Sequence, residues 1–213
     1  MAVRTRLSVD ERREQLIALG EELFSARPFD EISIDDIAAR AQISKGLLYH
    51  YFGSKRDFYV AVVSAGVRTL RAVTAVPDTV PEPERTERSL DAYLAYVEAH
   101  AAGYEQLMGS GGGADPEIAA IIDGARREFA ARVLVGLRRT GTDWGAGAAP
   151  PLLRSAVRGW VGMVEAASLD WAGHRDVPRA TLGRFLLLAL ADTARAALTE
   201  APAPPLDGAR GRV

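Results

Sequence analysis

Three closely spaced serines, each able to start a helix, constrain this fold more than any other feature of the chain. Ser33, Ser44 and Ser54 are residues whose hydroxyl can accept a hydrogen bond from an otherwise unpaired N–H of the first helical turn. Asp36 and Asp57 stand three residues after two of them, where a carboxylate meets the positive end of the helix dipole. The predicted helices span residues 34–41, 45–51 and 55 to about 75.

The two short helices are joined by a turn of only a few residues around Gln42, which is the connection length of a helix-turn-helix. Ala38 is small at the point where the two helices must cross closely. We expect the apolar faces of this pair to pack together. They comprise Ile34, Ile37, Ala38, Ala41, Ile43, Leu48, Tyr51 and Phe52.

Helical periodicity extends through the rest of the chain, and no run of alternating apolar and polar residues is long enough for a strand. The first helix opens at Ser8, which forms a capping box with Glu11, and ends at Pro28. Its predicted inner stripe is Leu16, Gly20, Leu23, Phe24 and Arg27.

Prolines 77, 81 and 83 interrupt the pattern, and we place a domain boundary there. Further helices are expected over 86–100, 103–108, 117–139, 152–173 and 178–199. We therefore predict an all-α fold with a homeodomain-like three-helix domain over residues 1–76 and a helical bundle over 77–200. The Ala- and Pro-rich end, 201–213, is expected to be a disordered tail.

Composition excludes several classes of protein. The chain has no cysteine, which removes disulfides, thiolate metal sites and cysteine nucleophiles. The three histidines show no metal-site spacing, and the glycine run 109–113 lacks the Lys-Ser/Thr pair that closes a phosphate loop. We expect no catalytic residue, metal or cofactor. Without a signal sequence or a run of about 18 apolar residues, a cytoplasmic location with no membrane contact is expected.

Overall charge gives little reason to expect a nucleic-acid partner. The net charge is −2, and residues 1–75 carry 11 Lys and Arg against 10 Asp and Glu. A local cluster would have to bind a polyanion. One candidate lies at 44–55, which holds the only two lysines of the chain together with Gly46, Tyr49 and His50, groups that suit close approach and phosphate contact.

The segment ISIDDIAARAQISKGLLYHYFGSKRDFYVAVV resembles the N-terminal DNA-binding domain of the tetracycline-repressor (TetR) family over about residues 8–65. The motif Ser-Lys-Gly-x-Leu-Tyr-x-Tyr-Phe-x-x-Lys carries this resemblance. Gln42, where the family usually has glycine, and Leu47, where many members have a small polar residue, depart from it. The resemblance implies contacts to double-stranded DNA from Ser33, Ser44, Lys45, Gly46, Leu47, Tyr49, His50, Tyr51 and Lys55, although Tyr51 could instead be a core residue.

The last two predicted helices are apolar over more than one face, so they need cover on more than one side. A two-fold homodimer through a four-helix bundle would supply this cover. The resemblance to TetR-like proteins implies the same use of the last two helices. Paired recognition helices would then read half-sites about 34–36 Å apart in a near-palindromic operator. The expected interface residues are Val157, Trp160, Val161, Val164, Phe185, Leu186 and Leu190.

Aromatic and methionine residues of the middle helices suggest a pocket for a small apolar or aromatic effector, although ordinary core packing is the alternative. They are Tyr93, Tyr96, Val97, Tyr104, Leu107, Met108, Phe129, Val133, Trp160 and Met163, with Arg158 and Glu165 as possible polar groups. The resemblance implies a repressor released from DNA by a ligand. An enzyme fits the inventory poorly, whereas a TetR-like protein that recruits a protein partner and has a filled core remains a second possibility.

Overall fold

The computed structural model describes residues 8–109, 115–145 and 147–200. These residues form nine α-helices and one 3-10 turn, with no strand among them, so the predicted all-α fold is confirmed. The expected tail, 201–213, lies outside the described residues. In chain order the elements are α1 (Val9–Ala26), η1 (Phe29–Glu31), α2 (Ile34–Ala41), α3 (Lys45–Phe52), α4 (Lys55–Val73), α5 (Glu82–Ala99), α6 (Ala101–Gly109), α7 (Pro116–Arg139), α8 (Pro151–His174) and α9 (Arg179–Thr199).

Serine hydroxyls start the first four α-helices, as the sequence predicts. Ser8 and Glu11 form the full capping box, in which the Glu11 carboxylate accepts from the Ser8 backbone N–H at 2.7 Å. The hydroxyls of Ser33, Ser44 and Ser54 each accept a hydrogen bond from the backbone N–H three residues on. Such caps satisfy donors that a helix leaves unpaired and stabilise it by about 1 kcal/mol each.

The N-terminal domain has its own core, in which aromatic rings of α1, α3 and α4 meet. The Phe58 ring is fully buried and lies 4.8 Å from the ring centre of Phe52 and 5.8 Å from that of Phe24. Arg27 was wrongly placed on the inner stripe of α1. It is exposed beyond the last turn and lies 3.9 Å from Asp36, because a guanidinium is costly to bury without a close partner.

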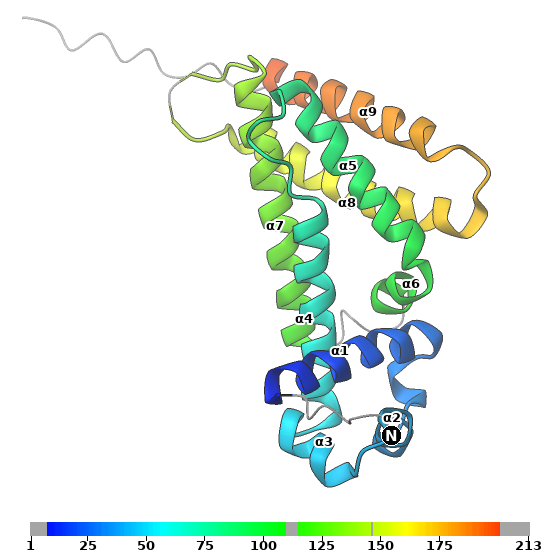
Figure 1. Cartoon of the computed structure of the whole chain (residues 1–213). Coiled ribbons are helices and arrows are strands. Elements are labelled where there is room, and N and C mark those ends of the chain that lie inside the picture. The colour runs from blue at the N-terminus through cyan, green and yellow to red at the C-terminus, as the bar shows by residue number, and fades with distance from the viewer. Residues whose placement is uncertain (1–7, 110–114, 146, 201–213) are drawn as a thin grey trace, which may run out of the picture.

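The helix α4 runs from the N-terminal domain into the bundle, with α7 beside it (Figure 1). Val63 of α4 packs with Ile118 and Ile122 of α7 in a small cluster between the two larger cores. Near its other end, Leu70 belongs to the bundle core. The two cores therefore share α4, and the proposed division at residue 76 follows part of α4 that already belongs to the bundle core.

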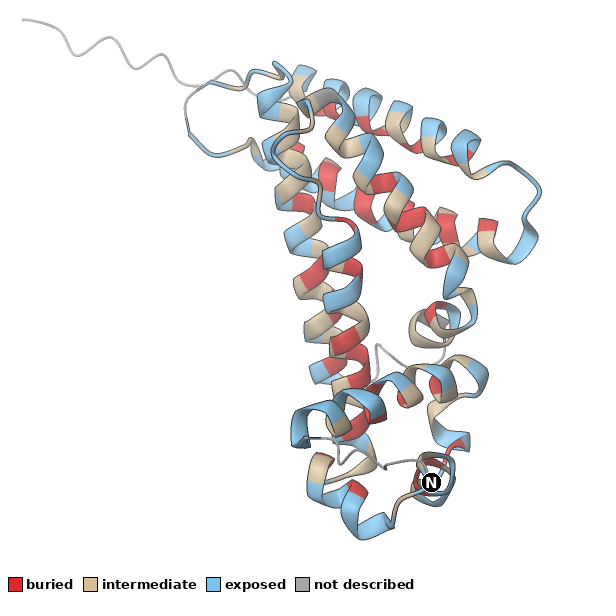
Figure 2. Ribbon diagram, in the orientation of Figure 1, coloured by how far each residue is buried: buried red, intermediate tan, exposed pale blue. Residues whose placement is uncertain are grey.

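Helices α5, α7, α8 and α9 enclose the bundle core, and α5 begins at Glu82, earlier than the predicted residue 86. Pro83 does not interrupt it, since a proline is tolerated in the first turn, where its missing N–H would have no partner. Trp160 Nε1 donates to the carbonyl of Leu186 at 2.7 Å and fixes α8 against α9. Figure 2 shows buried residues on the inner sides of these helices.

The structure contradicts most of the expected dimer interface. Six of its seven residues are buried within a single chain and are at most 6% exposed, so they have little surface to offer a partner. Large apolar side chains on α8 and α9 fill the bundle core against α5 and α7. The amphipathic pattern alone could not distinguish this packing within the chain from packing against a partner. The six are Val157, Trp160, Val161, Val164, Leu186 and Leu190; Phe185 is 53% exposed.

Close packing of α1 on α4 predicts that Gly20→Ala destabilises the protein. A Cβ at Gly20 would lie 2.4 Å from Val62 and 2.7 Å from the Phe58 ring, so both helices would have to shift. We expect a loss of about 1–3 kcal/mol in the free energy of unfolding, measured by urea denaturation.

Gly124→Ala is the matched control, because a Cβ there meets only the end of Arg127 at 3.9 Å. Alanine should stabilise that site by up to about 1 kcal/mol through its helix propensity. Equal effects of the two substitutions would contradict this packing.

Candidate nucleic-acid interface and internal cavity

The turn between α2 and α3 has the tight geometry of a helix-turn-helix. Gln42 adopts the left-handed conformation, with φ 54° and ψ 42°, which explains why the family usually has glycine at this position. The N–H of Ile43 then donates to the carbonyl of Ala38 at 3.0 Å, closing the end of α2. Ala38 and Leu48 are buried where the two helices cross.

One face of α3 is turned outward. Leu47 is 38% and Tyr49 46% exposed, and Gly46 and His50 are also exposed. Tyr51 is half-buried against the domain core, so it is only partly available for contact. Ser33 and Ser44 lie at the exposed starts of α2 and α3. The structure therefore brings the predicted contact residues together on one end of the molecule.

Both lysines have a partner within the chain, which the sequence did not predict. Lys45 Nζ lies 2.6 Å from Asp35 Oδ1 at an exposed site, where the pair is screened by solvent. Lys55 Nζ lies 4.0 Å from the centre of the Phe29 ring, a cation–π contact. Each amine remains on the same end of the molecule as the exposed face of α3.

An ion pair joins the start of α4 to the start of α7. The Arg56 guanidinium donates to both oxygens of Asp115, at 2.6 and 2.8 Å, and also pairs with Glu117 at 3.0 Å. Arg56 lowers the pKa of Asp115 below its ordinary value. Sequence reasoning missed this pair, because the two residues are 59 apart in the chain and neither belongs to a recognisable motif.

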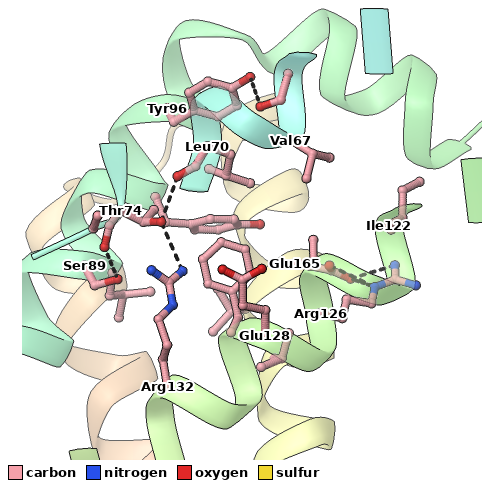
Figure 3. Close-up of a pocket in the computed structure, with 18 of the residues that line it drawn as sticks. Val67, Leu70, Thr74, Ser89, Tyr96, Ile122, Arg126, Glu128, Arg132 and Glu165 are labelled. Carbon is pink, nitrogen blue, oxygen red and sulfur yellow. Dashed lines mark hydrogen bonds and ion pairs between the residues drawn. The ribbon is translucent and has the colours of Figure 1, made fainter. Parts of the chain in front are cut away.

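A cavity of about 710 Å³ lies between α1, α4, α5, α6, α7 and α8, and Figure 3 shows part of its wall. Its volume falls in the range of small-molecule sites. Val97 and Met163 were wrongly expected there, since neither of them lines the cavity and Val97 is fully buried among other core residues. The other eight predicted residues do line the cavity: Tyr93, Tyr96, Tyr104, Leu107, Met108, Phe129, Val133 and Trp160.

The largest omission from the predicted cavity is the wall formed by α4. Its lining residues extend from Tyr59 to Thr74, about 22 Å at 1.5 Å per residue. Their spacing of three and four residues is a signal that the sequence carried, although it was not recognised as a cavity wall. This group comprises Tyr59, Val62, Val63, Gly66, Val67, Leu70 and Thr74.

Polar groups inside the cavity are mostly paired. The hydroxyls of Tyr93 and Tyr104 lie 2.8 Å apart, and Tyr93 is also 3.3 Å from the hydroxyl of buried Ser168. Burial raises the pKa of Tyr93 to about 12, so this network is neutral at physiological pH. Glu165 accepts from Arg126 with both oxygens at 2.9 Å, whereas Arg158 does not line the cavity.

The outer sides of α8 and α9 form an exposed face with few large side chains. Phe185 and Leu188 of α9 are 53% and 66% exposed, and Leu152 of α8 is 45% exposed. Between them α8 presents a row of small exposed residues: Ser155, Gly159, Gly162 and Ala166. A Cβ at either glycine would meet nothing within 4 Å in this chain, so another helix could approach closely.

In the part of the chain that the structure describes, no helix is both long and apolar enough to span a membrane. Within the same residues, no group of three His, Asp or Glu side chains lies close enough together to hold a metal ion.

Two family models match the chain. The model described as bacterial regulatory proteins, tetR family, matches residues 16–62, and the model described as tetracyclin repressor-like, C-terminal domain, matches residues 83–191. These ranges agree with the helix-turn-helix domain and with the bundle. A crystal structure of a tetR-family transcriptional regulator from Streptomyces coelicolor is 30% identical, with a TM-score of 0.74 over 92% of each chain.

Curated relatives match over shorter lengths. The transcriptional activator FasR of Mycolicibacterium smegmatis is 32% identical over 117 residues, 54% of this chain and 53% of FasR. The transcriptional repressor NemR of Escherichia coli is 41% identical over 51 residues, 24% of this chain and 26% of NemR. The matched part covers about half of FasR and about a quarter of NemR. Both relatives are transcriptional regulators. The chain belongs to the TetR family of helix-turn-helix transcriptional regulators.

Proposed function

We propose that this regulator binds a near-palindromic operator as a homodimer and that a small apolar ligand in the cavity changes its affinity for DNA. The observation that carries the proposal is α4, a single helix that starts beside α3 and lines the cavity along most of its length. A ligand against α4 is therefore placed to alter the position of the DNA-binding domain. Its DNA partner would locate the protein in the cytoplasm.

Ligand binding can control operator affinity only if the ligand has different affinities for the DNA-binding and the non-binding arrangement. The Arg56–Asp115 pair ties the start of α4 to α7, another cavity wall, so a change in the spacing of α4 and α7 would reach the DNA-binding domain. Repression relieved by the ligand is the simplest form, because occupancy then only has to lower DNA affinity. FasR is named an activator and NemR a repressor, and either sign would use these parts.

The cavity supports ligand sensing over the recruitment of a protein partner. A bundle that served only as a docking platform would gain stability from a filled core, because empty volume forfeits packing contacts. Here about 710 Å³ is left open between six helices, lined mainly by apolar side chains.

For the homodimer, we propose the exposed face of α8 and α9 in place of the buried stripe first expected. Small residues on α8 would allow the two copies to approach closely, and Phe185 and Leu188 would supply apolar area. A two-fold arrangement would repeat the α3 face in each half-site, about 34–36 Å apart.

Titration of purified protein onto the DNA upstream of its own gene tests the DNA-binding half of the proposal. Wild type should retard this fragment at low ionic strength without effector, and Lys55→Ala should weaken binding to all sequences. Loss of one phosphate contact should reduce the slope of log K against log salt by about one.

Arg88→Ala is the matched control, since it also removes one exposed positive charge but lies on α5, outside the DNA-binding domain. It should leave the salt slope unchanged. The absence of any retarded band for wild type would overturn the proposal, and an unchanged slope for Lys55→Ala would remove Lys55 from the interface.

Leu188→Glu should dissociate the dimer, because it buries a charge against the apolar face of the second copy. The change is repeated in both copies, and we expect the dimer dissociation constant to rise by at least about 30-fold, as for an interface hot spot. Sedimentation equilibrium should report a mass near 22.9 kDa at concentrations where wild type shows twice that mass.

Val9→Glu places the same charge at an exposed apolar site on α1 and should leave the dimer intact. A dimer of Leu188→Glu with unchanged affinity would mean that another surface joins the two copies.

A further inference from the structure

Among the described residues, the arginines and carboxylates that line the cavity have ion-pair partners, with two exceptions. Arg126 pairs with Glu165, and Arg85 and Arg139 both pair with Glu82. The remaining carboxylates of the wall are Asp78, paired with Arg85; Glu128, paired with Arg71; and Glu21. Arg132 and Glu21 therefore have no oppositely charged side chain within 4 Å in the part of the chain that the structure describes.

Arg132 is held in place with most of its donors unused. It reaches from α7 toward the end of α4, where it donates to the Thr74 hydroxyl at 3.2 Å (Figure 3). Its guanidinium carbon lies 4.4 Å from the centre of the Phe129 ring. A guanidinium has five N–H donors, and Thr74 is the one acceptor that the described residues give it.

Thr74 is itself part of a fixed network, so the position of Arg132 is well defined. The Thr74 hydroxyl is almost fully buried and donates to the carbonyl of Leu70 at 2.7 Å. The Thr74 carbonyl accepts from the Ser89 hydroxyl at 3.0 Å, which ties the end of α4 to α5. These hydrogen bonds join the end of α4, α5 and α7 next to the Arg132 guanidinium.

Partial burial makes this cation unfavourable without a close ion-pair partner. Burial lowers the pKa of Arg132, the charge of Glu128 raises it in part, and the charge of Arg71 lowers it by a smaller amount. An arginine nevertheless keeps its proton, so a bound anion would supply the acceptors that this guanidinium lacks. Burial raises the pKa of Glu21, and a carboxyl group, unlike a guanidinium, can neutralise itself by taking up a proton.

We propose that the cavity binds an amphiphile with one carboxylate, whose head group is held by Arg132 and whose extended apolar body lies along α4. This inference rests on the proposed ligand sensing and gives the ligand a chemical class. A carboxylate matches the planar donors of a guanidinium, and the wall of about 22 Å along α4 suits a long chain. A polyphosphate head is disfavoured, because the five carboxylates of the wall outnumber its four arginines.

The test compares tetradecanoate, tetradecan-1-ol and tetradecylamine, which share a chain and differ in head group, below their micellar concentrations. Each is titrated against full-length protein carrying the neutral dye Nile red, and displacement of the dye reports occupancy of the cavity. For wild type we expect tetradecanoate to displace the dye at concentrations lower by at least tenfold than the other two, as for a charge-assisted hydrogen bond.

Arg132→Gln should remove the preference for tetradecanoate. Its affinities for Nile red and for the alcohol should stay within about twofold of the wild-type values. An unfolded variant could not retain these affinities. Arg132→Lys keeps the charge without the planar donors and should show an intermediate preference. The matched control is Arg139→Gln, which removes an arginine from another part of the same wall. Glu82, the partner of Arg139, would still pair with Arg85 at 3.6 Å. This variant should keep the wild-type preference for tetradecanoate.

Equal displacement by the acid and the alcohol in wild type, or a preference that persists in Arg132→Gln, would overturn the proposal. If the probes then still alter operator affinity, ligand sensing stands and only the carboxylate class fails. If no probe displaces the dye or alters operator affinity, both proposals fail.

Discussion

The arrangement depends on α4 being one continuous helix shared by two hydrophobic cores. Phe58 near its start fills the core of the DNA-binding domain, and Leu70 near its end belongs to the bundle. Along an α-helix every backbone hydrogen bond is internal, so the helix transmits a displacement at one end as a nearly rigid body. The position of α3 is therefore linked to whatever fixes the distal half of α4.

The cavity weakens the restraint on that distal half. Where α4 faces the cavity, the apolar contacts that would hold it in a filled core are missing, and a ligand can supply them. Polar contacts remain at both ends: Arg56 ties the start of α4 to Asp115, and the Thr74 network ties its end to α5 and α7. Between these ends α4 packs closely on α1 and α7 and leaves one face toward the cavity, where a bound ligand would contact it.

Local signals in the sequence predicted the helices well and the faces of the bundle poorly. Ser33, Ser44 and Ser54 identify their helix starts because capping depends on neighbouring residues alone. The hydrogen bond from Arg132 to Thr74 could not be predicted, because it depends on where α4, α5 and α7 meet. Val157 and its neighbours on α8 were assigned to a partner because an apolar stripe indicates burial without saying by what. The row of small residues that includes Gly159 is the signal on which the proposed interface rests.

The most direct test of coupling through α4 is the distance between the two DNA-binding domains of the proposed dimer. Because the chain has no cysteine, a single spin label at Glu22→Cys, an exposed site on α1, gives one label per copy. We predict that operator DNA narrows the distribution of label distances, and that saturation with the amphiphile that displaces Nile red most strongly shifts it by several ångströms. An identical distribution with and without that amphiphile would contradict the account.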